Sequence, residues 1–246
     1  MLLDIDGTLS PIVPNAADAS VPETTRKLLI AVSRKFGLVA CVSGRQASDA
    51  RAMVSIGTIT YLGSHGAELL EAGWTESVLD PSVSEWSDRI HEFARQQDTS
   101  DLRRRRIRIE DKDTIVAFHW RGAPDEEAAR AATDAIAAQA TAAGLHVHWG
   151  RKVMEVRPPV RIDKGAGVRA LITRAGVDAA IYVGDDITDL DAFGALQALT
   201  DEGVLQHSLK VGVRSDDGPE AIETASDLVV DGTAGVQELL AALIAD

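Results

Sequence analysis

The sequence predicts an α/β protein in which helices cover a parallel β-sheet and a separate α+β unit interrupts the chain. Short β-branched or apolar runs alternate with amphipathic segments near both ends of the chain, which is typical of such a sheet. In the middle, strands follow one another with short connections, which favours antiparallel pairing. The 246 residues contain no internal repeat or low-complexity linker. This length suits one large domain or two small ones.

The first part of the core is expected to begin with a very short strand at Leu2-Leu3, because only three residues precede Asp4. Pro22–Lys35 has the apolar spacing of an amphipathic helix, with a proline at its start where a missing N–H is tolerated. Apolar runs predict the next strands at Phe36–Val42 and Ile59–Gly63.

The pattern changes after about Glu71 and changes back at Pro158-Pro159. We therefore expect a core of residues 1–72 and 159–246, with an inserted α+β unit at 73–158. Within the insert, we expect helices at Ser82–Gln97 and Pro124–Ala143, and strands at Arg104–Glu110, Thr114–Arg121, Leu145–Trp149 and Val153–Arg157. The core resumes with helices at Lys164–Ala175, Leu190–Ala198 and Ala234–Ala245, and strands at Ala180–Gly184, Leu209–Val213 and Leu228–Val230.

Composition excludes several classes of protein. With 25 basic and 38 acidic residues, the formal net charge of −13 argues against a nucleic-acid binder, which needs a basic face. The 45% of hydrophobic residues argues against disorder. The single cysteine, Cys41, is expected to be a core residue and excludes an internal disulfide framework. Neither a secretory signal nor a membrane-length apolar run is visible, so we expect a cytoplasmic protein.

The first candidate site is Asp4-Ile5-Asp6-Gly7-Thr8, directly after a strand. In an extended segment residues i and i+2 point to the same side, so Asp4 and Asp6 can face one pocket. Gly7 allows a sharp turn. Because open α/β sheets bind ligands beyond the carboxyl ends of their strands, this position predicts a site. An Asp-rich turn without function is the alternative interpretation.

Three further segments in the predicted core carry polar residues at comparable positions. Ser43 and the turn amides around it could hold an anion, and Lys164 lies in the first turn of a helix. Taken singly, these residues and the aspartates are explained as turn, surface and cap residues; taken together in this order, they favour a site. The segments are Ser43-Gly44-Arg45, Asp163-Lys164-Gly165 and Gly184-Asp185-Asp186-Ile187-Thr188-Asp189.

The four motifs resemble those of the haloacid dehalogenase superfamily of phosphotransferases over nearly the whole chain. The resemblance implies a Rossmann-like core with an inserted cap of the C2B type. Segments at 63–68, 110–112, 119–121 and 150–158 are similar to segments of trehalose-6-phosphate phosphatases. The sequence departs from that family at Leu190, where glutamate is usual, and at Trp120, where tyrosine is usual.

The resemblance implies roles for the core residues. Asp4 is expected to be the nucleophile that forms an aspartyl-phosphate, and Asp6 the general acid and base. Ser43 and Lys164 are expected to bind phosphoryl oxygens, and Arg45 to orient this loop and the substrate. Mg²⁺ is the expected cofactor. Its expected ligands are Asp4, Asp185 and the backbone carbonyl of Asp6. Asp189 is expected either to bind the metal through a water molecule or to hold the direct ligands in place, and Asp186 could do either.

For the insert, the resemblance implies that charged side chains contact sugar hydroxyls or orient the substrate; they are Glu110, Lys112, Arg121, Lys152 and Glu155. His65 and His119 lack the thiol and imidazole neighbours of a zinc site. Arg103–Arg106 falls within a predicted strand of an acidic protein without interleaved aromatic residues, so we interpret it as a surface of the insert rather than a nucleic-acid patch.

The sequence thus predicts a magnesium-dependent sugar-phosphate phosphatase, most simply one that acts on trehalose 6-phosphate. The partner is a small molecule, and we expect a monomer or a weak homo-oligomer. Alternatives within the superfamily are a sucrose-phosphate or mannosylglycerate-phosphate phosphatase, or a catalytically impaired member. The alternative from another class is a signalling protein that accepts phosphate on Asp4, which the insert and the paired Asp6 argue against.

Overall fold

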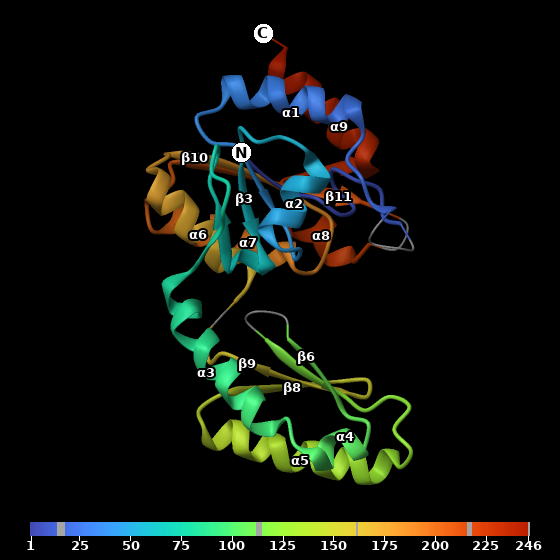
Figure 1. Ribbon diagram of the computed structural model, residues 1–246. Coiled ribbons are helices and arrows are strands. Elements are labelled where there is room, and N and C mark those ends of the chain that lie inside the picture. Colours follow the sequence, from blue (N-terminus) through green and yellow to red (C-terminus); the bar gives the residue numbers. More distant parts are fainter. Residues whose placement is uncertain (14–17, 112–114, 161, 216–217, 246) are drawn as a thin grey trace. The chain divides into compact units, whose positions relative to one another are not determined.

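The chain forms two compact units in the computed structural model, which describes residues 1–13, 18–111, 115–160, 162–215 and 218–245. Unit 1 comprises Met1–Leu79 and Ile162–Asp246, and unit 2 comprises Asp80–Arg161. Both units are drawn in Figure 1.

Among the described residues of unit 1, eight strands form one sheet in the order β12-β11-β10-β1-β2-β3-β4-β5. The six strands from β12 to β3 run parallel, and β4 and β5 are antiparallel additions at one edge. This confirms the predicted parallel sheet. The strands are β1 (Leu2–Asp4), β2 (Ala40–Val42), β3 (Thr60–Gly63), β4 (Glu68–Leu70), β5 (Val78–Leu79), β10 (Ala179–Gly184), β11 (His207–Arg214) and β12 (Leu228–Asp231).

Helices cover both faces of this sheet. Leu3 and Tyr61 point into one core with α1, α2 and α9, whereas Leu2 and Tyr182 point into the other core with α6, α7 and α8. Because both faces are covered, every residue of β1, β2 and β3 is buried. Figure 1 shows α1 and α9 side by side on their face. The helices are α1 (Glu23–Lys35), α2 (Ala47–Val54), α6 (Lys164–Ala175), α7 (Asp189–Asp201), α8 (Glu220–Ala225) and α9 (Gly232–Ile244).

Local sequence explains where the helices of unit 1 begin and end. Helix α1 carries Glu23 in its first turn and Arg34 and Lys35 in its last, charges that complement the helix dipole. Helix α6 is capped by Asp163, whose Oδ1 accepts the Ala166 N–H at 2.8 Å. It thus begins at Lys164, which fixes the position of that lysine.

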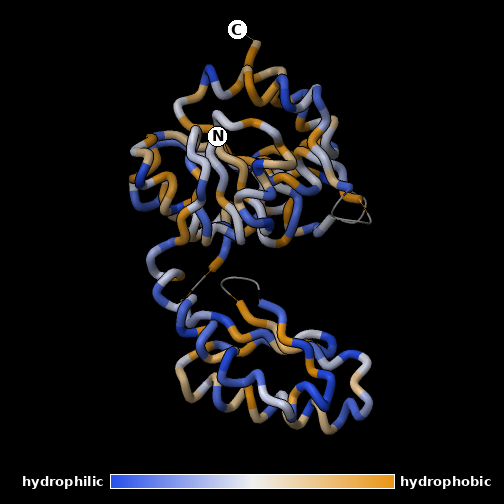
Figure 2. Tube along the Cα trace, in the orientation of Figure 1, coloured by the Kyte–Doolittle hydropathy of each residue, from blue (hydrophilic) through white to orange (hydrophobic). Residues whose placement is uncertain are grey.

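Unit 2 contains a four-stranded antiparallel sheet in the order β6-β7-β9-β8, packed against helices. In Figure 2 the orange of hydrophobic residues alternates with blue along its elements, as expected for a sheet and helices with one buried side. The core includes Phe118, Met154 and Ile136, each buried. The elements are α3 (Pro81–Gln97), α4 (Ser100–Arg104), β6 (Arg108–Asp111), β7 (Val116–His119), α5 (Glu126–Ala142), β8 (His146–Gly150) and β9 (Val153–Arg157).

One predicted strand is largely wrong. In Arg104–Glu110, only Arg108–Glu110 belongs to a strand, because Thr99 caps a short helix that continues to Arg104. Arg103 pairs with Asp98 through two hydrogen bonds of 2.9 and 2.6 Å, and Arg104 and Arg105 pair with Asp101. These local pairs explain the arginine run as an exposed helix end.

Other elements were not anticipated from the sequence. The structure adds α2, α8, β4 and β5, and it shortens the predicted strand Phe36–Val42 to Ala40–Val42. Residues 36–39 lead into the strand from the end of α1. All of the added elements are short, with eight residues at most, so periodicity over a longer window does not detect them.

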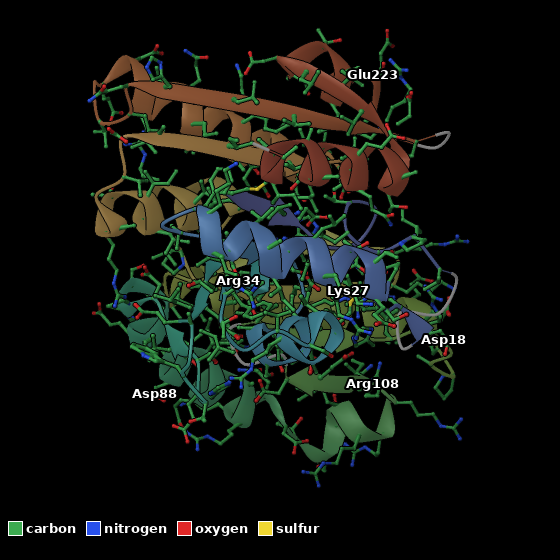
Figure 3. The ribbon with its side chains drawn as sticks, turned by 90° about the horizontal axis from the view of Figure 1, so that it is seen from above. Asp18, Lys27, Arg34, Asp88, Arg108 and Glu223 are labelled. Atoms are coloured by element: carbon green, nitrogen blue, oxygen red, sulfur yellow. The ribbon has the colours of Figure 1, made fainter. Side chains whose placement is uncertain are left out.

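Unit 1 carries charged side chains on its outer helices. Figure 3 labels Lys27 and Arg34, both exposed on α1, and Glu223, which is half-buried on α8. Lys27 pairs with Glu23 one turn earlier at 2.8 Å. None of the helices in the described ranges combines the length and apolar composition needed to cross a membrane.

We expect Leu3→Ala to lower the free energy of unfolding by about 2–5 kcal/mol, because Leu3 is fully buried in the central strand and its loss leaves a cavity. Denaturant unfolding followed by circular dichroism measures the change. Leu228→Ala is the matched control, since Leu228 is 42% exposed, and should cost less than about 1 kcal/mol. Equal losses in the two variants would contradict this account of the core.

Candidate active site

The candidate site lies at the carboxyl edge of the parallel sheet. Strand β1 pairs with β10 on one side and with β2 on the other, all parallel. Asp4 ends β1, Ser43 follows β2 and Asp185 follows β10, so the three residues emerge at the same edge. All three side chains are buried. The topology therefore brings together residues that are up to 181 positions apart in the sequence.

The turn after β1 presses its backbone against Asp185. Gly7 has a φ of +89°, and a Cβ built at this position would lie 2.0 Å from Asp185 Oδ2. Both the backbone conformation and the close approach require glycine here. Thr8 then donates from Oγ1 to Asp185 Oδ1 at 2.8 Å. The turn thus positions the Asp185 carboxylate beside Asp4.

Lys164 is the buried cation of the site. Its ammonium donates to Asp4 Oδ1 at 2.6 Å and to Asp189 Oδ1 at 2.7 Å, and the lysine is only 3% exposed. A charge this deeply buried is tolerated only when it is paired and hydrogen-bonded. Lys164 therefore links the end of β1 to the start of α7.

Asp189 anchors the loop that follows β10. Its Oδ1 accepts from Lys164 and from the hydroxyl of Tyr182 at 2.7 Å, and its Oδ2 accepts the N–H groups of Asp185 and Asp186, both at 3.0 Å. A carboxylate has about four lone-pair sites, so these four hydrogen bonds use its accepting capacity. Asp189 thus holds the loop in shape and positions Lys164.

Asp6 is engaged by Arg45. Nε and Nη2 of the guanidinium donate to the two carboxylate oxygens at 2.8 and 2.7 Å, a bidentate pair. The Asp6 side chain is 39% exposed, so it reaches away from the buried Asp4 cluster toward the Ser43 loop. The Arg45 N–H in turn donates to Ser43 Oγ at 3.2 Å. Arg45 therefore connects the loops that follow β1 and β2.

Burial and like charges shift the pKa values of the cluster. Burial raises the pKa of Asp4 well above its usual range, and the nearby charge of Asp189 adds to this, while Lys164 acts in the opposite direction. The pKa of Asp185 rises to about 6, mainly through burial and against the hydrogen bond from Thr8. Burial alone would lower the pKa of Lys164, but Asp4 and Asp189 raise it above its ordinary value. The lysine is therefore charged.

The cluster has the composition of a divalent-cation site. Ligand atoms of Asp4, Asp185 and Asp189 lie within 4.8 Å of one another, and Lys164 supplies one positive charge against three carboxylates. Oδ2 of Asp4 and Oδ2 of Asp185 accept no hydrogen bond from the described residues, so both remain for a cation. The donor set fits Mg²⁺, which prefers a few carboxylate oxygens. Asp189 instead holds Lys164 and the backbone of Asp185 and Asp186 in place.

In unit 2, the polar face of the sheet carries two of the expected sugar-binding residues. Glu110 and Glu155 both lie opposite Ala117 in the register, on the strands that flank β7. Oε2 of Glu110 lies 2.7 Å from Nε2 of His119, and Arg157 donates to Glu155 Oε2 at 2.5 and 3.1 Å.

The other expected residues of unit 2 lie at turns. Arg121 follows β7 and donates to the Arg151 carbonyl at 3.4 Å, and Lys152 lies in the turn between β8 and β9 and pairs with Glu126 at 2.8 Å. The Trp120 N–H donates to the Lys152 carbonyl at 3.2 Å, so these two turns are adjacent. Lys112 lies outside the described residues.

Sequence reasoning missed two residues of the cluster, Tyr182 and Thr8. Tyr182 is fully buried in β10, where a tyrosine hydroxyl needs a partner, and this requirement was a usable signal. Thr8 belongs to the first motif, but its bond to Asp185 spans 177 positions and has no local signature.

The sequence matches one family model and several curated proteins. The family model described as trehalose-phosphatase matches residues 2–231. A trehalose-phosphate phosphatase of Mycobacterium marinum is 34% identical over 215 residues, covering 80% of this chain and 51% of its own. A protein of Mycobacterium tuberculosis described as an uncharacterized glycosyl hydrolase is 32% identical over 214 residues, covering 80% of this chain and 15% of its own. The chain thus spans about half or less of the length of these curated relatives.

Solved structures share the fold. The structure of the Aspergillus fumigatus trehalose-6-phosphate phosphatase matches 99% of this chain and 91% of its own, with a TM-score of 0.64 and 20% identity. A haloacid dehalogenase-like hydrolase from Bacteroides thetaiotaomicron matches 98% of both chains, with a TM-score of 0.60 and 17% identity. At these identities the likeness concerns the fold, and it confirms the expected haloacid dehalogenase-like architecture.

The raised pKa of Asp185 predicts a pH dependence of stability in metal-free buffer. Because its pKa is about 6 in the folded protein against a usual 3.8, the folded state favours the protonated form. This contribution to the free energy of unfolding is fully present below about pH 4 and is lost as the pH rises through about 6. Asp185→Asn lacks it, so the wild type should lose stability relative to the variant over this range.

Denaturant titrations from pH 4 to 7 in a chelator, for the wild type and Asp185→Asn, measure the difference. A divalent cation should oppose the loss in the wild type, because it binds the deprotonated carboxylate. Parallel pH profiles for the two proteins would contradict the assignment to Asp185.

Proposed function

The chain belongs to the trehalose-phosphatase family, and we propose that it hydrolyses a sugar phosphate, trehalose 6-phosphate, to the free sugar and inorganic phosphate. The observation that carries this proposal is the position of Asp4, at the carboxyl end of the central strand, hydrogen-bonded to Lys164 and beside Asp185. A nucleophilic carboxylate next to a fixed cation and a cation site is the arrangement that phosphoryl transfer needs.

In the first step, Asp4 attacks the phosphorus atom. The hydrogen bond from Lys164 to Oδ1 of Asp4 orients the carboxylate for this attack. The bond between phosphorus and the sugar oxygen breaks, and its electron pair leaves with that oxygen. The product is an aspartyl-phosphate on Asp4, which divides one difficult hydrolysis into two easier steps.

Asp6 completes both steps as acid and base. It donates a proton to the departing sugar oxygen, and it then accepts a proton from the water that attacks the phosphorus and releases Asp4. Because Arg45 engages both oxygens of Asp6, the pair must separate, at least at one oxygen, before Asp6 donates its proton.

Lys164 and Ser43 stabilise the charge on the phosphoryl oxygens. The Lys164 ammonium lies at the Asp4 carboxylate, and Ser43 is 1% exposed in the loop after the neighbouring strand. Both donors are held before substrate binds, so they need little reorganisation during the reaction. A bound Mg²⁺, held by Asp4 and Asp185, supplies Lewis-acid neutralisation of the phosphoryl charge.

Unit 2 is proposed to be the cap that selects the sugar. Its polar sheet face carries Glu110 and Glu155, carboxylates that can accept hydrogen bonds from sugar hydroxyls. Arg121, Lys152 and Lys112 are proposed to assist them. The family relationship favours trehalose 6-phosphate over sucrose phosphate or mannosylglycerate phosphate as the substrate.

We expect Asp4→Asn to lower kcat for trehalose 6-phosphate by at least about a thousandfold, since an amide oxygen is a poor nucleophile. Release of inorganic phosphate measures the rate, and circular dichroism verifies the fold. Asp178→Asn, an exposed position in the loop before β10, is the matched control and should retain wild-type activity. Near-native activity of Asp4→Asn would refute the mechanism.

We also expect a chelator to abolish turnover and Mg²⁺ to restore it. The carboxylate cluster explains the metal requirement, because only one ammonium offsets its charge.

Within a panel of sugar phosphates, we expect kcat/KM to be highest for trehalose 6-phosphate. The panel includes sucrose phosphate, mannosylglycerate phosphate and a monosaccharide phosphate. Preference for the monosaccharide phosphate would overturn the substrate, and no turnover of any compound would indicate an impaired family member.

A further inference from the structure

The loop after β3 is strained at two successive residues. Ser64 and His65 have φ values of 49° and 57°, in the left-handed region that non-glycine residues rarely adopt. They form the start of a short 3-10 turn (η2, Ser64–Gly66) at the carboxyl edge of the sheet. Such strain persists only where the surrounding structure holds it, and it concentrates at functional sites.

The strained loop is tied to the loop that carries Ser43 and Arg45. The His65 N–H donates to the Ser43 carbonyl at 3.0 Å, and the Ser64 N–H donates to the Arg45 carbonyl at 2.7 Å. The two loops therefore form one rigid piece of backbone.

Glu68 on β4 ties the same two loops through its side chain. Its carboxylate is 6% exposed and accepts from Ser64 Oγ at 2.6 Å and from the Ala47 N–H, at the start of α2, at 2.9 Å. Burying a carboxylate costs free energy of folding, even when both of its oxygens accept hydrogen bonds. This cost indicates that the shape of the loop is important.

The loop exposes the imidazole of His65, and Gly44 in the neighbouring loop leaves space beside this ring. A Cβ at Gly44 would lie 2.7 Å from His65 Cε1 and 2.8 Å from Nε2. The φ of Gly44 is outside the left-handed region, so a side chain here would act by displacing the His65 ring rather than by straining the backbone. The left-handed backbone at His65 and the absence of a side chain at Gly44 thus place the imidazole next to Ser43.

We propose that the His65 imidazole donates a hydrogen bond to a phosphoryl oxygen of the substrate, beside Ser43, and that Glu68 is its positioning residue. The proposal rests on the proposed phosphatase function. The ring lies against Gly44, the immediate neighbour of Ser43, and an imidazole N–H is a donor in either of its charge states. It adds a donor at a site where described carboxylates outnumber the one buried ammonium.

The kinetic test compares His65→Ala and His65→Asn with the wild type. Loss of a hydrogen bond to a charged oxygen should lower kcat/KM about 10- to 100-fold in His65→Ala. His65→Asn should recover part of it, because asparagine tolerates the left-handed conformation and keeps an N–H donor. His207→Ala, which removes an exposed histidine at the start of β11, is the matched control and should be unchanged.

The same assay assigns the contact to phosphate or sugar. A phosphoryl contact predicts the same fold-loss for trehalose 6-phosphate and for p-nitrophenyl phosphate, which share only that group. A loss confined to the sugar phosphate would overturn the assignment to the phosphoryl group.

A double-mutant cycle tests the geometry. Gly44→Ala should impair activity by displacing the imidazole, whereas adding Gly44→Ala to His65→Ala should cause no further loss, because the ring it displaces is absent. Additive losses would show that Gly44 serves the backbone and not His65. Glu68→Gln should lower activity in the wild type but not in His65→Ala, which separates positioning from folding.

His65→Gly separates function from structure. Glycine relieves the left-handed strain, so the Tm should stay the same or rise while kcat/KM falls as in His65→Ala. A fall in Tm with unchanged activity would overturn the proposal, because His65 would then be a structural residue.

Binding of inorganic phosphate distinguishes failure of this proposal from failure of the proposed function. In the presence of Mg²⁺, phosphate should shift the ring NMR signals of His65, assigned by their absence in His65→Ala, and leave those of His207 in place. If the wild type hydrolyses no sugar phosphate but the His65 signals shift, only the proposed function fails. If it does hydrolyse one and the signals do not move, only the role of His65 fails.

Discussion

The rest of the site depends on one interaction, the pair of hydrogen bonds from the Lys164 ammonium to Asp4 and Asp189. It joins the central strand, the first residue of α6 and the first residue of α7 at one buried point. A buried ion pair is a weak source of stability, because removing charges from water offsets most of their attraction. Its presence here is better explained by reactivity. Lys164 opposes the rise that burial causes in the pKa of Asp4, and Asp189 keeps the lysine in place.

The same cluster bears on how an acidic protein can bind the anionic substrate that we propose. The chain carries a net charge of −13, and from residue 185 to the end it has 14 acidic residues against two basic ones. A field of this sign does not steer a phosphate toward the site. The proposed function therefore requires short-range groups for capture, namely Lys164, Ser43 and the cation that Asp4 and Asp185 fit. The net charge argues against a nucleic-acid partner and is compatible with one small phosphate bound locally.

The loops around the cluster are held in shape by interactions that local propensity disfavours. Gly7 turns against Asp185, Arg45 engages Asp6, and the loop at Ser64–His65 is strained in the left-handed region. These departures all lie at the carboxyl edge of the sheet, whereas most of the longer helices and the parallel strands follow their sequence patterns. Conflicts between local and tertiary preferences are expected at functional sites, where geometry is maintained at some cost in stability.

The sequence by itself determined the parallel sheet, most helices of both units and the edge at which Asp4, Ser43, Lys164 and Asp185 meet. It could do so because hydrophobic periodicity is local and because the carboxyl ends of parallel strands share one edge. Only the tertiary structure decided which side chains pair there. The hydrogen bonds from Tyr182 to Asp189, from Arg45 to Asp6 and from the Ala47 N–H to Glu68 join different elements. A hydrogen bond depends on distances of a few tenths of an ångström, which are set by packing between segments remote in sequence and leave no local pattern.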